Sequence, residues 1–279
     1  MNQQQLMVQT DLSKPYLGIV GCSYSHWFYG DCELKSYPAL IAKKFPQYNI
    51  IDLSIISGSN ESAFFRLHNF EQKYKIKFSK IVWQLTHFCR ELVMIDYKNN
   101  DFVLQNIKEH ENYFYTEGHY VKHYNFAINI EHVKDNMNKL VEYFDIKKTD
   151  LYKYYVNKFA SNQHVWLLQK EIDHINSHYG EKNVLIFSWH TKIDLESTSK
   201  NFFAYDWETG LGNAVGNKSN ATQDLEFELP KNYIGAIQDM FGNDKFWKLG
   251  VDDSPHYGSQ GHAEVFDVLH NNVVKLIEG

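Results

Sequence analysis

Short apolar runs separated by amphipathic stretches form the main pattern along this sequence. Residues 16–21 read Tyr-Leu-Gly-Ile-Val-Gly, an apolar run bounded by turn-forming residues, which is typical of a buried parallel strand. Apolar runs at 49–56, 80–85 and 183–189 predict three further strands. Between these runs, apolar residues recur at the three- and four-residue spacing of helices that bury one face.

The helix signals fall between the predicted strands. A first helix is expected to begin at Pro38, because proline suits the first helical turn. A second is expected after Asn60, which is predicted to be its N-cap, and the last near Ser259. Strands that alternate with helices predict a three-layer α/β/α fold with a central, mostly parallel sheet.

The interval between the third and fourth strands is far longer than one crossover needs. Apolar residues at helical spacing within it predict a helical insertion at about 96–180, with Asp150 as a cap and Gly180 as a stop. Residues at about 195–232 are rich in Gly and Asn and predict a long surface loop or hairpin. We expect one domain over residues 1–279, in which the insertion caps the active site, forms a dimer interface or binds a partner.

Composition and charge narrow the range of partners. The chain has 279 residues, 28 of them basic and 34 acidic, and its net charge of -6 argues against a nucleic-acid partner. No stretch approaches the ~20 apolar residues needed to cross a bilayer, so no membrane insertion is expected. The first residues lack an apolar signal region, and the three cysteines lack the spacing of a zinc ribbon or disulfide framework. A cytoplasmic protein is expected, and release by lysis or as part of a particle stays open.

Two short polar segments carry the residues best suited to chemistry. Ser23 directly follows the first strand, where open α/β sheets place their sites. Asp253 and His256 lie in a turn before the last helix and have the chemistry of an orienting carboxylate and a general base. Taken alone, a serine in this place is commonly a cap or turn residue, and Asp-x-x-His is commonly a polar turn. His262 is expected to have a capping or packing role.

The order of these segments is similar to that of the SGNH (GDSL-type) hydrolases. The resemblance rests on Gly-x-Ser after the first strand, Ser-Gly-Ser-Asn after the second, and the string Asp-Ser-Pro-His-Tyr-Gly-Ser-Gln-Gly-His that begins at Asp253. It implies a flavodoxin-like sheet in which Ser23 is the nucleophile, His256 the general base and Asp253 its orienting carboxylate. It further implies that the backbone N–H groups of Gly58 and Ser23 form the oxyanion hole.

The segment after the third strand departs from the family pattern. The family usually carries Gly-x-Asn-Asp there, and its asparagine donates to the oxyanion, whereas residues 83–90 contain no asparagine. The candidates to donate in its place are Thr86, Gln84 and His87, with Thr86 first by position. Arg90, one of only two arginines, is either a contact for an anionic substrate or the oxyanion, or a salt-bridge partner. Cys22 stands where the family commonly has aspartate, and it is expected to face the core.

The resemblance implies a serine esterase that hydrolyses an oxygen ester, with an acetyl group on a glycan as the family's commonest theme. An O-acyltransferase using the same site and an inactive glycan-binding module are the alternatives. No metal or cofactor is expected, because His119 and His123 with nearby Glu117 lack the HExxH pattern. The expected partner is a small-molecule or glycan ester, and the sequence leaves a homo-oligomer open.

Overall fold

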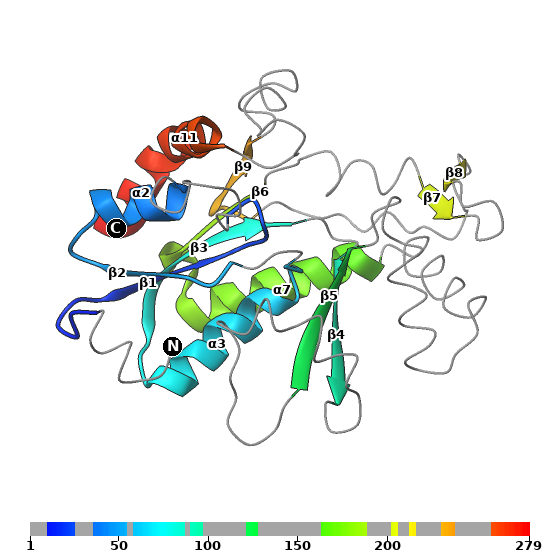
Figure 1. Ribbon diagram of the computed structural model, residues 1–279, viewed down its shortest axis with the longest axis horizontal. Coiled ribbons are helices and arrows are strands. Elements are labelled where there is room, and N and C mark those ends of the chain that lie inside the picture. The colour runs from blue at the N-terminus through cyan, green and yellow to red at the C-terminus, as the bar shows by residue number, and fades with distance from the viewer. Residues whose placement is uncertain are drawn as a thin grey trace.

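A five-stranded parallel sheet forms the centre of the computed structural model (Figure 1). The structure describes residues 10–25, 36–54, 58–86, 163–188, 230–237 and 258–279, and the backbone of strands at 90–96, 121–127, 202–205 and 212–215. The strands of the sheet are β1 (Tyr16–Val20), β2 (Asn49–Asp52), β3 (Phe78–Leu85), β6 (Val184–Ser188) and β9 (Tyr233–Ala236). Their spatial order is β2-β1-β3-β6-β9, which is the flavodoxin-like order when these five strands are counted alone.

Helices cover both faces of this sheet. Helices α2 (Tyr37–Lys44) and α11 (Ser259–Glu278) lie on one face, and α3 (Ser62–Tyr74) and α7 (Gln163–Tyr179) lie on the other (Figure 1). The predicted three-layer α/β/α fold with a central parallel sheet is therefore confirmed.

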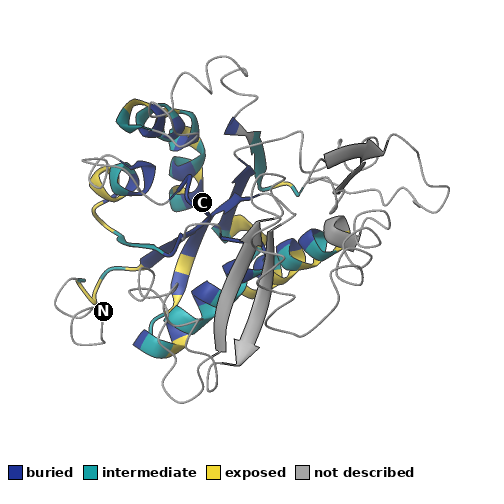
Figure 2. Cartoon of the chain, turned by 45° about the vertical axis from the view of Figure 1, so that its right-hand side comes forward, coloured by how far each residue is buried: buried dark blue, intermediate teal, exposed yellow. Residues whose placement is uncertain are grey.

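Side chains of the central strands alternate between two cores, because successive residues of a strand point to opposite faces. In β1, Leu17 and Ile19 pack with α2 and α11, whereas Tyr16 and Val20 pack with α3 and α7. Strands β3 and β6 alternate in the same way. The centre of the sheet is consequently buried on both faces, as the dark blue strands of Figure 2 show.

Local signals set most of the helix boundaries. The Ser36 hydroxyl accepts a hydrogen bond from the Ala39 N–H at 3.4 Å and caps α2, with Pro38 in the first turn as predicted. Helix α7 ends at the predicted Gly180, whose φ of 83° is a conformation that favours glycine. The predicted cap of α3 was wrong, because the cap position belongs to Glu61 and the Asn60 side chain bonds elsewhere.

Strand β9 was not predicted from the sequence. It is only four residues long and contains Gly235 at a φ of 97°, so no run of alternating or apolar residues marks it. The strand is placed by tertiary contacts, among them a hydrogen bond of 3.0 Å from the Asn232 amide to the Val184 carbonyl. The periodicity of apolar residues therefore does not predict this four-residue strand.

The interval between β3 and β6 differs from the expected helical insertion. Strands β4 (Arg90–Asp96) and β5 (Val121–Ala127) form an antiparallel pair, and α7 belongs to the main helical layer. Apolar and β-branched residues in β4 suit a strand. The remaining positions of the predicted insertion, including Asp150, lie outside the described residues. Within 195–232, β7 (Phe202–Tyr205) pairs with β8 (Gly212–Val215).

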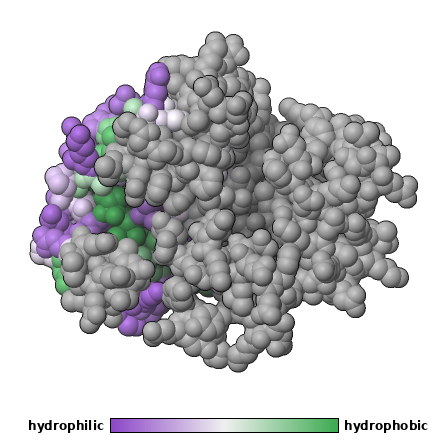
Figure 3. All heavy atoms as spheres, viewed as in Figure 1, coloured by the Kyte–Doolittle hydropathy of each residue, from purple (hydrophilic) through white to green (hydrophobic). Residues whose placement is uncertain are grey.

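The described part of the surface is mainly polar. In Figure 3, hydrophilic residues surround a narrower band of hydrophobic ones on the face shown. Among the described residues, the large hydrophobic side chains with high exposure are Leu12 and Trp166. None of the described helices is both long and apolar enough to span a membrane.

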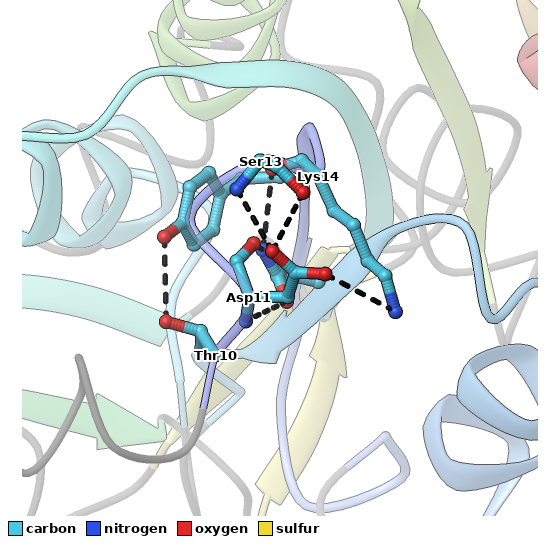
Figure 4. Close-up of polar contacts among 6 residues, drawn as sticks. Thr10, Asp11, Ser13 and Lys14 are labelled. Carbon is cyan, nitrogen blue, oxygen red and sulfur yellow. Dashed lines mark hydrogen bonds and ion pairs between the residues drawn. The ribbon is translucent and has the colours of Figure 1, made fainter.

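A polar turn fastens the amino ends of β1 and β2 together (Figure 4). The Asp11 carboxylate accepts hydrogen bonds from the N–H and the hydroxyl of Ser13, at 3.0 and 2.6 Å, and these bonds lower its pKa. The Asn49 amide donates to the carbonyls of Asp11 and Lys14 at 2.7 and 3.2 Å. These contacts fix the edge of the sheet opposite to the predicted active site.

Candidate active site

Four predicted site residues lie at or after the carboxyl ends of three adjacent strands of the sheet. Ser23 follows β1, Gly58 follows β2, and Gln84 and Thr86 lie at the end of β3. Because β1 pairs in parallel with both neighbours, these carboxyl ends lie along one edge. In the flavodoxin-like order, the crevice beside the first strand at this edge is where ligands bind. The four residues are buried in the structure.

The loop of residues 21–25, which we call the Ser23 loop, turns sharply after β1. The Ser25 N–H donates to the Cys22 carbonyl at 3.0 Å, and the Cys22 side chain lies fully buried in the core, as expected. A side chain at Gly21 has no room, since a Cβ there would lie 2.7 Å from Oε1 of Gln84. Glycine at this position therefore allows the end of β3 to approach the loop closely.

A buried chain of hydrogen bonds holds this loop from both sides. The Tyr37 hydroxyl donates to the Ser25 hydroxyl, which donates to Oε1 of Gln84. The Cys22 N–H donates to the same Gln84 oxygen at 3.4 Å. Burial raises the pKa of Tyr37 well above its ordinary value, so its hydroxyl stays protonated and remains a donor. Residues of α2 and β3 together thus fix the loop that carries Ser23.

These contacts favour a positioning role for Gln84. Its amide oxygen accepts from the loop, and its amide nitrogen lies 3.5 Å from the Cys22 sulfur. The oxyanion donation expected from the sequence stays a prediction for Gln84, but its described contacts all serve the Ser23 loop.

Replacing Gln84 by methionine separates the two roles. We expect Gln84→Met to lower the free energy of unfolding by about 1–3 kcal/mol, because the Ser25 hydroxyl and the Cys22 N–H lose their acceptor. Urea denaturation of the variant and the wild type measures this change. Unaltered stability with a large fall in turnover of p-nitrophenyl acetate would contradict the positioning role and favour direct oxyanion donation.

Asn60 ties the loop after β2 to the end of β3. Its amide donates to the Thr86 carbonyl at 2.8 Å, and its amide oxygen accepts from the Thr86 N–H at 2.8 Å. This reciprocal pair fixes the segment that begins at Gly58 against the strand next to the Ser23 loop. Sequence reasoning missed it, because an asparagine just before a helix has the same signature as an N-cap.

The Arg66 side chain forms hydrogen bonds to the Ser23 loop and to the chain after β2. This buried guanidinium donates through Nη1 to the carbonyls of Gly21 and Leu53, at 3.0 and 2.6 Å, and thereby links the carboxyl ends of β1 and β2. Of the two arginines, only Arg90 was considered from the sequence and Arg66 was overlooked, while the predicted role of Arg90 stays a prediction. Of Arg90 the structure describes only the backbone, at the start of β4.

The half-buried Asp52 carboxylate carries the opposite charge to Arg66 and interacts with it electrostatically. Burial raises the pKa of Asp52 to about 6, although the Ser54 N–H and the positive charge of Arg66 oppose the rise. Burial lowers the pKa of Arg66 to about 10, and Asp52 opposes this fall. Arg66 is thus a cation at neutral pH, with Asp52 as its counter-charge beneath the candidate site.

The start of α11 is linked to the Ser23 loop through Tyr37. The Tyr37 N–H donates to Nδ1 of the buried His262 at 3.3 Å, and the Tyr37 hydroxyl reaches Ser25. These contacts agree with a packing role for His262. The first turn of α11, which begins at Ser259, therefore lies close to the elements that hold Ser23.

Some predicted site residues lie outside the described residues. They are Asp253, His256 and His87, together with His119 and Glu117 of the metal alternative. The structure places Ser23, Gly58, Gln84 and Thr86 at or after the carboxyl ends of adjacent strands, and the catalytic roles of all the candidates stay predictions.

A solved structure is similar to this chain over most of its length. No family model and no curated protein matches the chain. The solved structure is that of the psychrotrophic esterase EstA from Pseudoalteromonas sp., inhibited by monoethylphosphonate, with 11% sequence identity and a TM-score of 0.44. The match covers 95% of this chain and 100% of that one. At this identity and TM-score, the likeness by itself assigns neither a site nor an activity.

Proposed function

We propose that the protein is a serine esterase of the SGNH (GDSL-type) kind, with Ser23 as its nucleophile. The observation that carries the proposal is that Ser23, Gly58 and Thr86 follow the carboxyl ends of adjacent strands of a flavodoxin-like sheet. The hydrogen bonds of Gln84, Asn60 and Arg66 support it, because they hold the loops that carry these residues. A nucleophile and its oxyanion donors must be fixed relative to each other before substrate binds.

In the proposed reaction, His256 takes the proton of the Ser23 hydroxyl while Oγ of Ser23 attacks the ester carbonyl. Asp253 accepts a hydrogen bond from His256 and holds the required tautomer. The tetrahedral oxyanion is stabilised by the N–H groups of Ser23 and Gly58. Its collapse breaks the ester bond, and His256 returns the proton to the departing alcohol.

Deacylation repeats these steps with water. His256 removes a proton from water, whose oxygen attacks the acyl-enzyme, and the acid leaves as Ser23 recovers its proton. In an O-acyltransferase, a sugar hydroxyl replaces this water. The N–H of Thr86 already donates to Asn60, so a contribution of Thr86 to the oxyanion comes from its hydroxyl.

A series of p-nitrophenyl esters tests the proposed activity and its acyl preference. We expect the wild type to hydrolyse the acetate faster than the octanoate, because the acetyl group of a glycan is the proposed natural acyl group. His256→Ala, which lacks the general base, serves as the control for non-enzymatic release. Faster turnover of octanoate would contradict an acetyl group as the natural acyl group. Absence of turnover with every ester would contradict the esterase proposal and favour the inactive glycan-binding module.

A further inference from the structure

A second group of side chains with ligand chemistry lies between α3 and α7. His68 and Glu71 are one turn apart on α3, and His178 lies in the last turn of α7. One ligand atom from each of the three lies within 4.8 Å of the other two. Because Glu71 accepts from the N–H of Phe78 at the start of β3, the group lies at the edge of the sheet opposite to Ser23.

The carboxylate of this group is fixed in place. Glu71 is buried, and its Oε1 accepts the Phe78 N–H at 2.8 Å. Its Oε2 faces Nε2 of His178 at 3.8 Å, a distance too long for a hydrogen bond. A backbone N–H on one carboxylate oxygen is the kind of contact that orients a metal ligand. Through its other oxygen Glu71 faces His178 of α7, and the carboxylate also interacts electrostatically with the Tyr179 hydroxyl.

The two imidazoles pack against the ring of Phe64. The ring of Phe64 stacks on His68 at a centroid distance of 5.7 Å and meets His178 edge-on at 5.1 Å. Nδ1 of His68 is buried and has no hydrogen-bond partner among the described residues. A buried polar nitrogen without a partner is costly, and binding of an ion is one explanation for such a group. The side chain of His178 is 33% exposed, which leaves a path from solvent.

We propose that His68, Glu71 and His178 bind a divalent transition-metal ion, with Zn²⁺ as the best fit. Two imidazoles and one carboxylate are a common zinc ligand set, with water in the fourth position, whereas Mg²⁺ and Ca²⁺ prefer oxygen ligands alone. Zinc–ligand distances of about 2.0–2.2 Å require the three side chains to close around the ion. The exposed His178, near the end of its helix, has the freedom to do so.

Such an ion would join α3 to α7 away from the catalytic edge. Its ligands come from two helices that are far apart in the sequence, so the complete set exists only in the folded protein. Binding to the folded state alone raises thermal stability as the ion concentration rises. The proposed site is therefore structural, and it is independent of the proposed esterase activity.

Zinc titration of the chelator-treated full-length protein tests this site. We expect the wild type to bind ZnCl₂ in calorimetry and to show a higher Tm with added ZnCl₂. Loss of a ligand in His178→Ala should weaken binding by about 10- to 100-fold or more and remove most of the Tm shift. Glu71→Gln retains an acceptor for the Phe78 N–H but loses the anionic ligand, so it should weaken zinc binding in the same way.

His174→Ala is the matched control, because His174 is an exposed histidine one turn before His178 that also packs on Phe64. This variant should keep the zinc affinity and Tm shift of the wild type. A wild type whose Tm does not respond to ZnCl₂ overturns the proposal. Equal zinc affinity in His178→Ala and the wild type overturns it too, as does a loss in His174→Ala as large as that in His178→Ala.

Discussion

Ser23→Ala is expected to lower the turnover of p-nitrophenyl acetate by about 10⁴-fold or more, because the nucleophile of the proposed reaction is lost. The effect should fall on kcat and leave the fold intact, since the change removes only one hydroxyl from a buried turn. Steady-state kinetics of the purified variant measure the loss. Circular dichroism and Tm of the same sample verify that it is folded.

Ser25→Ala is the matched control for Ser23→Ala. Ser25 lies two residues away in the same loop, but its hydroxyl joins Tyr37 to Gln84. This variant should lose stability through the broken hydrogen-bond chain and should keep far more activity than Ser23→Ala. If Ser25→Ala were inactive and Ser23→Ala active, the assignment of the nucleophile would be contradicted.

Arg66→Met is expected to have the largest effect on stability, at about 3–5 kcal/mol lost from the free energy of unfolding. The substitution leaves the carbonyls of Gly21 and Leu53 without the guanidinium and removes the counter-charge of Asp52. Without that cation the pKa of Asp52 rises further, so protonation of its carboxyl relieves part of the cost at neutral pH. Urea denaturation at pH 7 measures the difference.

Two further variants test whether the loss in free energy of unfolding comes from the hydrogen bonds of Arg66. Arg66→Lys keeps the positive charge but lacks the planar fork that reaches two carbonyls, so its stability should lie between those of Arg66→Met and the wild type. Gln72→Met changes an exposed residue of the same helix and should be nearly neutral. A loss of less than about 1 kcal/mol in Arg66→Met would mean that this guanidinium does not hold the ends of β1 and β2.

The main sheet was predictable because its central strands are buried on both faces. The apolar runs that contain Leu17, Val82 and Ile186 mark β1, β3 and β6, and strong local signals at Pro38 and Gly180 mark helix ends. Periodicity and turn chemistry act over a few residues, so the sequence shows them directly. The position of Ser23 at the carboxyl edge followed from these elements.

Long-range polar contacts were not predictable in the same way. The bonds of Asn60 to Thr86 and of Arg66 to Gly21 join residues 26 and 45 positions apart, and no local pattern marks them. Gln84 was singled out correctly as a residue near the site, but its partners depend on how closely β3 approaches the Ser23 loop. These hydrogen-bond partners come together only in the folded chain, so the local sequence does not show them.

Covalent labelling of the folded wild type with a fluorophosphonate probe, followed by peptide mapping, tests the central proposal most directly. The probe reacts with serines that an adjacent base activates. We expect a single adduct on Ser23, no adduct in Ser23→Ala and greatly reduced labelling in His256→Ala. Failure of the folded wild type to react, or an adduct on another serine that persists in Ser23→Ala, would contradict the assignment of Ser23 as the nucleophile.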